Sequence, residues 1–474
     1  MHTPAPRHES TVARTFFALG SGDASARVIA FAAFVYLARV LGAEAFGTLE
    51  LAAAIVLYGS RLVDLGFEIG LGVRETAAGD EESRSRLVGT GLAMRLASAV
   101  VVIALTAGLG LLFLPPAEGR VLALYALTLL AVGLGTRWVH LGFERSRVVA
   151  LARVLGEVTM VTTVLVFVRS PDDLLRVPLA RFGGDMLTAA LLLIGARLLI
   201  ARRPRIDRAL ARSLIPRALP LVGSSLFGLM IFNADLIFLR VFEGRAAVGH
   251  YAAAYALTSF LSNMGIAYSL SLLPALTRLR DRAGELGDLY RTAHAQVFTV
   301  GVAVAAGGTL LAAPVVSLVF GPEYRASVLP LAIVIWAVPV GLVRDLPVTA
   351  LISAGRERPI VRLTGQAAAI NMALNLLLVP SFGLAGAATA TVLTEIARWR
   401  LAARASRPLG LRPPPPTRYI RGLAAALAMA AVLYLTPDLA LWARIPLGVA
   451  VWVATLAAVG AIRRIDGGRP GLSV

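Results

Sequence analysis

The sequence contains no cysteine and no lysine, and it has few charged residues for its length. Of its 474 residues, 46 are of the Lys+Arg type, every one an arginine, and charged residues make up 16% of the chain. Without cysteine there are no disulfides and no thiol catalysis. Without lysine the chain lacks the side chain that a Walker A loop needs and cannot form a lysine Schiff base, which argues against ATP hydrolysis by this chain.

Catalytic and cofactor motifs are also missing. The sequence has no HExxH, no GxSxG and no dinucleotide-binding fingerprint. His140 has no second metal ligand at a useful spacing, and the PDD stretch at 171–173 lacks the surrounding domain that a metal-dependent sugar transferase needs. We therefore expect no metal, no cofactor and no enzymatic activity.

Apolar residues dominate what is present. They make up 57% of the chain and the mean hydropathy is +0.76, whereas an ordinary soluble protein has about 25% charged residues. A formal net charge of +18 would suggest nucleic acid binding in a soluble domain. Here the arginines lie between apolar runs, as the positive-inside rule predicts for a polytopic membrane protein. No nucleic acid partner is expected.

The apolar runs predict an all-α protein with many membrane spans. A span needs about 20 mostly apolar residues, and about 14 runs qualify. They are 15–38, 47–66, 87–113, 121–142, 148–167, 177–200, 219–242, 248–276, 293–320, 328–352, 360–379, 384–402, 419–435 and 441–462. The loops on one side carry about 32 arginines and those on the other about 8, so we expect both termini in the cytoplasm.

Two linkers divide the chain. In residues 201–218, Ile206, Leu210 and Leu214 recur at i, i+4 and i+8 among arginines, which predicts a basic amphipathic helix lying among anionic lipid headgroups on the cytoplasmic side. Residues 405–418 hold four consecutive prolines, which cannot continue a helix. We expect a first lobe of six spans at 1–200, a second at 219–404, and a detached pair of spans with a tail at 419–474.

The two lobes show a weak internal repeat. The segments YLARVLGAEAFGTLELAAA from Tyr36 and IFLRVFEGRAAVGHYAAAYA from Ile237 align at Arg39 with Arg240, Gly42 with Gly244, Ala45 with Ala247, Gly47 with Gly249, and Ala52 with Ala254. An even number of spans lies between them, which predicts parallel repeats related by a pseudo-two-fold axis along the membrane normal. The alternative is chance similarity within an alanine-rich chain.

The segment NMALNLLLVPSFGLAGAATATVLTE, from Asn371 to Glu395, combines amides with small residues inside an apolar run. Small residues let membrane helices approach one another closely. Asn371 and Asn375 lie four residues apart and so share one helical face. We expect both amides to hydrogen-bond to a neighbouring helix.

Charged and amide side chains also occur at membrane depth, where a charge costs at least about 2.5–3.5 kcal/mol. The first half carries Asp23, Arg27, Arg61, Asp64, Arg95, Glu157 and Asp185, and the second carries Asn233, Asp235, Asn263, Arg344 and Asp345. The spacing of Asp23 with Arg27, and of Arg61 with Asp64, allows a local ion pair in each case. One interpretation is that these pairs only permit insertion. The other is that Arg27, Arg61 and Arg95 form a cationic pocket for a phosphorylated headgroup.

Three segments resemble a known family. LARVLGAEAFGTLELAAA (Leu37 to Ala54), LVDLGFEIGLGVRETA (Leu62 to Ala77) and ISAGRERPIVRLTGQAAAINMALNLLLVPSFGLAGAATATVLTE (Ile352 to Glu395) resemble polysaccharide flippases of the Wzx (O-antigen) type. These belong to the MOP superfamily with the lipid II flippases and MATE exporters. The resemblance implies two six-helix lobes around a central cavity, a C-terminal helix pair that forms a groove for a lipid tail, and a bacterial cytoplasmic (inner) membrane location.

The implied cargo is an oligosaccharide on a polyprenyl diphosphate, flipped from the inner to the outer leaflet by alternating access for surface polysaccharide synthesis. Partners would be this substrate and anionic membrane lipids, with a polysaccharide polymerase as a candidate. The expected binding residues are Arg27, Arg61, Arg95, Asp23, Asp64, Asn233 and Asn263. Candidates for a coupled ion are Asp64, Glu157, Asp235 and Asp345.

Two other classes of function compete with this one. A MATE-like ion-coupled exporter of small molecules would share the fold, but for cationic drugs it predicts an acidic cavity, which the arginine-rich first half does not favour. A membrane polysaccharide polymerase or ligase would be expected to have a large outer loop with catalytic residues, whereas every outer loop predicted here is short. The sugar, the coupling ion and the oligomeric state stay open.

Overall fold

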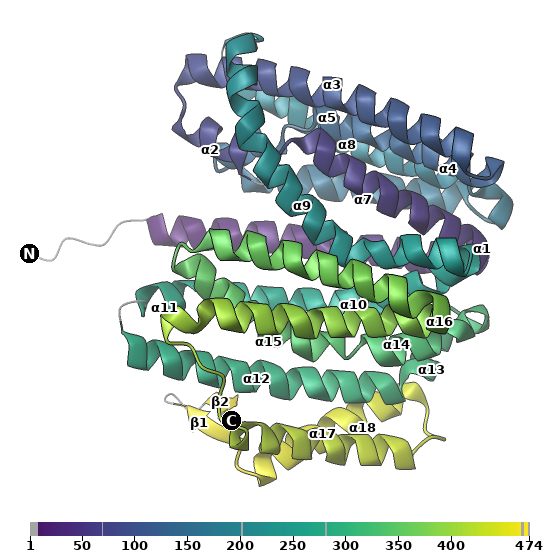
Figure 1. Cartoon of the computed structure of the whole chain (residues 1–474), viewed down its shortest axis with the longest axis vertical. Helices are drawn as coiled ribbons and strands as arrows, with labels where there is room; N and C mark the ends of the chain where they lie inside the picture. Colours follow the sequence, from purple (N-terminus) through teal and green to yellow (C-terminus); the bar gives the residue numbers. More distant parts are fainter. Residues whose placement is uncertain (1–7, 69, 201, 280–281, 466–468, 473–474) are drawn as a thin grey trace, which may run out of the picture. The chain divides into compact units, whose positions relative to one another are not determined.

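The computed structural model describes residues 8–68, 70–200, 202–279, 282–465 and 469–472, with side chains from Val28 onward apart from 263–267, 270, 283, 357 and the C-terminal hairpin. Almost all of these residues are helical (Figure 1). The longer helices are α1 (His8–Asp64), α3 (Glu81–Phe113), α4 (Pro116–Ala126), α7 (Ser146–Phe167), α8 (Arg176–Leu199), α9 (Arg208–Phe242), α10 (Arg245–Ser271), α12 (Ala283–Leu310), α15 (Ala337–Ser353), α16 (Glu357–Ser406), α17 (Thr417–Leu435) and α18 (Leu441–Ala458).

Shorter elements connect these helices. They are α2 (Leu71–Ala78), α5 (Thr128–Leu134), α6 (Arg137–Gly142), α11 (Leu273–Arg278), α13 (Ala312–Val319), α14 (Val328–Val334) and the 3₁₀ helices η1 (Pro171–Asp173), η2 (Pro322–Ser327) and η3 (Arg407–Leu409). A two-stranded antiparallel hairpin, β1 (Ile462–Ile465) with β2 (Arg469–Leu472), follows α18. The sequence analysis expected a tail there and did not predict these strands.

The chain forms two compact units, Met1–Leu226 (unit 1) and Phe227–Val474 (unit 2). The boundary between them falls inside α9 and not in a loop. Within unit 1, α1 packs against α3, α4 and α7, and α8 packs against α5 and α7. Within unit 2, α15 packs against α10, α12 and α16.

The described helices are apolar enough to make a multi-pass membrane protein. Ten of them have the length and composition to cross a membrane, or eleven if the bent pair formed by Pro322–Val334 and Ala337–Ser353 is counted as one span. Two of the ten, α1 and α16, each contain two of the runs expected from the sequence. The expected count of 14 therefore stays a prediction.

Glycines in a positive-φ conformation interrupt both of these long helices. Gly42 in α1 has φ 73°, and Gly383 in α16 has φ 51°. Gly244, which aligns with Gly42 in the proposed repeat, has φ 95° between α9 and α10. Only glycine adopts such angles without steric cost, so these positions fix where each helix pair bends.

One core cluster of unit 1 is built around two aromatic residues. Phe67 and Trp138 are fully buried, and their ring centroids lie 5.1 Å apart. A Cβ on Gly72 would come within 2.8 Å of both rings, and one on Gly91 within 2.6 Å of Phe67. The glycines therefore leave the space that these two aromatic rings fill. Leu214 of α9 is buried in the same cluster.

The basic linker differs from the expected surface helix. Residues 208–218 form the first turns of α9, a single helix that continues to Phe242. Leu214 is fully buried and Leu210 packs against the unit 1 core, while Ile206 precedes the helix and is exposed. The apolar face that predicted contact with lipid is thus covered by protein over the two leucines.

The residues just before α9 lie on α3 as an extended strap, 202–207. The Ser85 hydroxyl donates to the Arg203 carbonyl (2.6 Å), the Arg205 amide donates to the Ser85 carbonyl (3.3 Å), and the Asp207 amide donates to the Thr90 hydroxyl (2.9 Å). The backbone of Arg205 passes so close to Gly89 that any Cβ there would collide with it. The strap and the start of α9 are therefore anchored to unit 1.

The C-terminal helix pair is also attached more firmly than predicted. Helix α17 packs along α12, and α18 packs along α17 (Figure 1). The Tyr419 hydroxyl lies 2.9 Å from His294 Nδ1, and Gly422 sits directly against Thr299. The proline run at 413–416 changes the direction of the chain but does not detach the pair from unit 2.

A substitution at Gly89 tests the strap. We expect Gly89→Ala to lower the melting temperature of the detergent-purified protein, because forced overpacking costs about 1–3 kcal/mol. Gly108→Ala in the same helix is the control, since a Cβ there meets nothing within 4 Å and alanine favours a helix by about 1 kcal/mol. Equal melting temperatures for the two variants would contradict the close approach of the strap.

Candidate substrate and ion sites

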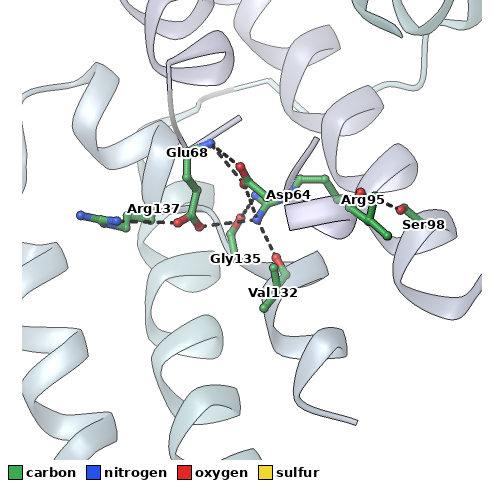
Figure 2. Close-up of polar contacts among 8 residues, drawn as sticks. Asp64, Glu68, Arg95, Ser98, Val132, Gly135 and Arg137 are labelled. Carbon is green, nitrogen blue, oxygen red and sulfur yellow. Dashed lines mark hydrogen bonds and ion pairs between the residues drawn. The ribbon is translucent and has the colours of Figure 1, made fainter. Parts of the chain in front are cut away.

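A buried cation organises the end of α1 in unit 1. Arg95 of α3 is 0% exposed, and its guanidinium donates to the carbonyls of Gly135 (2.5 Å) and Val132 (2.6 Å). Its Nη2 also lies 3.4 Å from Asp64 and 3.5 Å from Glu68 (Figure 2). Arg137 contacts the other oxygen of Glu68 at 3.7 Å. Charges on four elements thus neutralise one another locally.

This arrangement corrects two expectations. Arg95 was predicted to face a cationic pocket, but its Nη atoms are committed to carbonyls and acids inside unit 1. The spacing of Arg61 and Asp64 allows a local pair at i, i+3, but Asp64 pairs with Arg95 and also accepts from the Glu68 amide (3.2 Å). The fully buried guanidinium has the greater need of a counter-charge, so the tertiary pair prevails over the local one.

Because Asp64 pairs with Arg95, Arg61 is available to bind another group. It is half-buried in the last turn of α1, and it makes no hydrogen bond or ion pair with the described residues. A guanidinium without a bound acid keeps its planar set of donors for an external anion. The sequence analysis named Arg61, and it missed Glu68 and Arg137, which lie beyond helical spacing from Arg95.

Glu157, a candidate for a coupled ion, is paired with an arginine that the sequence analysis did not select. Both Glu157 oxygens lie 3.3 Å from Nη1 of Arg181, whose Nε donates to Asp185 at 3.0 Å. These contacts join α7 to α8. The i, i+4 spacing of Arg181 and Asp185 was the signal that could have revealed the pair.

Unit 2 contains a fully buried carboxylate with no cation beside it. Asp235 of α9 is 0% exposed and accepts hydrogen bonds from the Tyr251 hydroxyl (2.8 Å), the Thr391 hydroxyl (2.6 Å) and the Asn375 amide (2.7 Å). Asn371 completes this Asp235 network by donating to Thr394 (3.2 Å). Within the described part of the chain, no arginine or histidine forms an ion pair with Asp235.

The Asp235 network confirms the expected role of the two amides. Asn375 reaches across to α9, and Asn371 reaches the half of α16 that follows the bend at Gly383. The sequence analysis named Asp235 but missed Tyr251 and Thr391. Their hydroxyls carry no charge and no spacing signal in an apolar run, so only the packing of α10 and α16 on α9 reveals them.

A second charged cluster lies between α15 and α16. Arg344 contacts its neighbour Asp345 (2.7 Å) and Glu395 (3.4 Å), and Glu395 also pairs closely with Arg398. The Arg398 guanidinium lies over the Phe232 ring, 5.2 Å from its centroid. We call Arg344, Asp345, Glu395 and Arg398 the α15/α16 charge cluster. The sequence analysis identified its first two members only.

The other predicted site residues are not drawn together. Asn233 is half-buried and donates to the Leu229 carbonyl of its own helix (3.3 Å). The side chains of Asp23, Arg27 and Asn263 lie outside the described residues, so their predicted contacts stay predictions. Among the described residues, no three His, Cys, Asp or Glu side chains come together in a group that could hold a metal ion.

Unit 2 also has an apolar groove of about 440 Å³ between α10, α12, α17 and α18. Its lining includes Leu257, Val300, Gly307, Met429, Val449 and Trp452. A groove of this size matches a ligand site of ordinary dimensions, but its walls offer hydrocarbon and not hydrogen bonds.

Solved transporter structures share this fold. A lipid II flippase MurJ in an inward closed conformation matches with a TM-score of 0.80 at 11% identity, covering 93% of this chain and 98% of that one. A MOP superfamily transporter from Pyrococcus furiosus matches at 0.59 and 15% identity, covering 84% and 95%. A mutant of the Vibrio cholerae MATE transporter VcmN matches at 0.55 and 14%, covering 84% and 96%. Identities this low establish the fold alone.

A comparison with curated proteins finds no significant match. The sequence profile of the family described as "Polysaccharide biosynthesis protein" matches residues 12–280, which is more than half of the chain. Because this profile covers more than half of the sequence, the chain belongs to the polysaccharide biosynthesis protein family.

Proposed function

We propose that this protein flips an oligosaccharide linked to polyprenyl diphosphate from the inner to the outer leaflet of a bacterial cytoplasmic membrane, by alternating access, for surface polysaccharide synthesis. Both termini would lie in the cytoplasm, where the arginines of the strap and of α9 face anionic lipids. The observation that carries the proposal is the Arg61 guanidinium, which lies in a helix long and apolar enough to span a membrane and forms no ion pair with any acid among the described residues.

The barrier to flipping is desolvation of the charged headgroup. A diphosphate and its sugars leave water at a cost of several kcal/mol for each unsatisfied polar group. Arg61 offers a fixed charge and a fork of donors that matches phosphate oxygens. Arg95 supports this role indirectly, because it forms the ion pair with Asp64. Arg27 and Asp23, expected near the same cavity, stay predictions.

The lipid part of the cargo needs a different surface. A polyprenyl tail is an apolar chain, and the groove between α10, α12, α17 and α18 offers it an apolar lining. Helix α17, which contributes Met429 and Leu433 to the lining, packs closely on α12. The tail would therefore occupy the groove while the headgroup is carried by polar side chains.

Transport against a gradient needs a coupled ion, because the chain lacks an ATP site. Of the predicted candidates, Asp64, Glu157 and Asp345 each pair with an arginine, whereas Asp235 has hydrogen bonds but no counter-charge. An isolated buried carboxylate is costly unless a cation joins it. We therefore assign coupling to Asp235, with a proton or Na⁺ as the cation.

Substitutions of Arg61 and of Arg95 are expected to have different effects. Arg61→Ala should reduce polysaccharide export about 10- to 100-fold at a normal protein level, since a charge-assisted hydrogen bond is worth about 1.5–3 kcal/mol. Arg95→Met should lower the protein level instead, because breaking a buried ion pair costs about 3–5 kcal/mol. Arg120→Ala, at an exposed position of α4, is the control. Normal export by Arg61→Ala would remove Arg61 from the mechanism.

Asp235→Asn is expected to remove ion dependence without loss of fold. In the wild type, a cation that binds only the folded protein should raise stability by about 2.7 kcal/mol at 100 times its Kd. Thermal unfolding in NaCl against KCl, and across a pH series, measures this effect. The variant should show neither response, while Asp288→Asn, in an exposed ion pair, should keep both. A retained response in Asp235→Asn would place the ion elsewhere.

A bulky side chain in the apolar groove of unit 2 should prevent binding of the lipid tail. A Cβ on Gly307 meets only Met429 (3.4 Å) and Leu433 (4.0 Å), so the side chain in Gly307→Phe enters the open groove. We expect lower export and less photo-crosslinking to a polyisoprenyl diphosphate probe, at an unchanged melting temperature. Leu427→Phe, on the exposed face of α17, controls for added bulk. Undiminished crosslinking in Gly307→Phe would count against the groove as the tail site.

A further inference from the structure

The Asp235 network and the α15/α16 charge cluster are consecutive layers of one polar column in unit 2. One helical turn separates them on three helices: Asp235 from Phe232 on α9, Tyr251 from Tyr255 on α10, and Thr391 from Glu395 on α16. The Tyr251 and Tyr255 rings are stacked with centroids 6.1 Å apart. Since α9 runs opposite to α10 within these steps, all three lead from Asp235 in the same direction.

Tyr255 links the two layers. Its ring stacks on that of Tyr251, whose hydroxyl donates to Asp235, and it lies one turn further along α10, toward the layer of Glu395. Exposure rises along the column: Asp235 is 0% exposed, and the side chains of Glu395, Arg398 and Asp345 are 6%, 12% and 17% exposed. A cation that reaches Asp235 by this route passes Glu395 and the rest of the α15/α16 charge cluster before it arrives.

The two layers differ in charge. The α15/α16 charge cluster has two arginines and two acids, so its formal charge is zero, whereas the Asp235 network has one acid and no cation. The arginine charges are permanent. Glu395 is shared between Arg344 and Arg398, from two helices, and the Nε atoms of both arginines are buried without a hydrogen-bond partner. Glu395 is thus the acid of the cluster that contacts both guanidinium groups beside the route, whereas Asp345 contacts Arg344.

We propose that the α15/α16 charge cluster is the electrostatic gate through which a monovalent cation reaches Asp235, with Glu395 as the residue that keeps the passage neutral. Glu395 does not ligate the bound cation in this scheme. It acts on the rate of entry by cancelling the field of Arg344 and Arg398. The inference rests on the proposed coupling role of Asp235 and adds the path and its controlling residue.

Among the residues with described side chains, the charged and titratable groups near Glu395 come from four helices. Helix α15 contributes Arg344 and Asp345, α16 contributes Arg398, α10 contributes Tyr255, and α9 contributes Asp235 one layer away. Helix α14, which also packs on α16, carries no titratable residue. The charge of the passage is therefore set by two arginines and two acids.

The test measures the speed of cation entry on the purified full-length protein. Stopped-flow tryptophan fluorescence, to which Trp399 beside Arg398 contributes, follows the response to a Na⁺ jump at fixed pH and, in a second arm, to a pH jump without Na⁺. Glu395→Gln makes the passage positive and should slow the response about tenfold, a modest share of what charge focusing achieves. The midpoint of the equilibrium titration should move less than about threefold.

Arg398→Gln makes the passage negative and should speed the response. The double variant Glu395→Gln/Arg398→Gln restores a formal charge of zero and should return the rate to near that of the wild type. A merely structural role predicts the same direction of change for both single variants, and it predicts the greatest damage in the double. Asp288→Asn is the control for loss of a surface acid and should match the wild type.

The failures of the two proposals are distinguishable. A response that survives in Asp235→Asn, or is absent from the wild type in both arms, overturns coupling at Asp235 and with it the gate. A wild-type response that depends on Asp235 but keeps its rate in Glu395→Gln overturns the gate alone. So does a rate that falls in both single variants, or a midpoint that shifts as much as the rate.

Discussion

Charge compensation inside the helical bundle is the constraint on which the rest of this structure depends. An ion that leaves water for such an interior loses hydration worth several kcal/mol, and a counter-charge with good hydrogen bonds is needed to offset the loss. Arg95 meets this need with Asp64, Glu68 and two carbonyls, and Arg181 meets it with Glu157 and Asp185. Against this background, Arg61 and Asp235 stand out, because neither forms an ion pair with the described residues.

The sequence predicted the class of fold because the governing signals are local. Apolar runs of about 20 residues, arginine-rich loops and glycines at the bends are all visible in a single chain. The linker before α9 shows the limit of such signals. Its apolar period at Leu210 and Leu214 was detected correctly, but periodicity does not say whether lipid or protein covers the face. The packing of both leucines in the core of unit 1 decides that.

The candidate sites were predictable to the extent that their members carry charge. Charge at membrane depth identified Asp64, Asp235 and Arg344, but helical spacing offered Arg61 as the partner of Asp64, because Arg61 is near in sequence while Arg95 is near in space. Neutral members such as Tyr251 and Thr391 gave no signal at all. The tertiary structure decides which charged side chains have a partner of opposite charge. The sequence therefore identifies the candidates, but it does not distinguish arginines held in internal ion pairs from arginines that can bind an external anion.

The absence of lysine makes the distinction between paired and unpaired basic residues more important. A buried lysine can lose its proton and become neutral, whereas an arginine stays charged under all ordinary conditions. Every basic side chain inside this bundle, histidine apart, is therefore a fixed charge, and each must be matched by an acid, by carbonyl oxygens, as at Arg444, or by an anion from outside. It follows that the charge of an internal passage can change chiefly through its carboxylates and the cations they attract. A transporter built on fixed guanidinium groups can bind a phosphorylated headgroup steadily and still respond to ions, provided that some acid, as at Asp235, is left without a permanent partner.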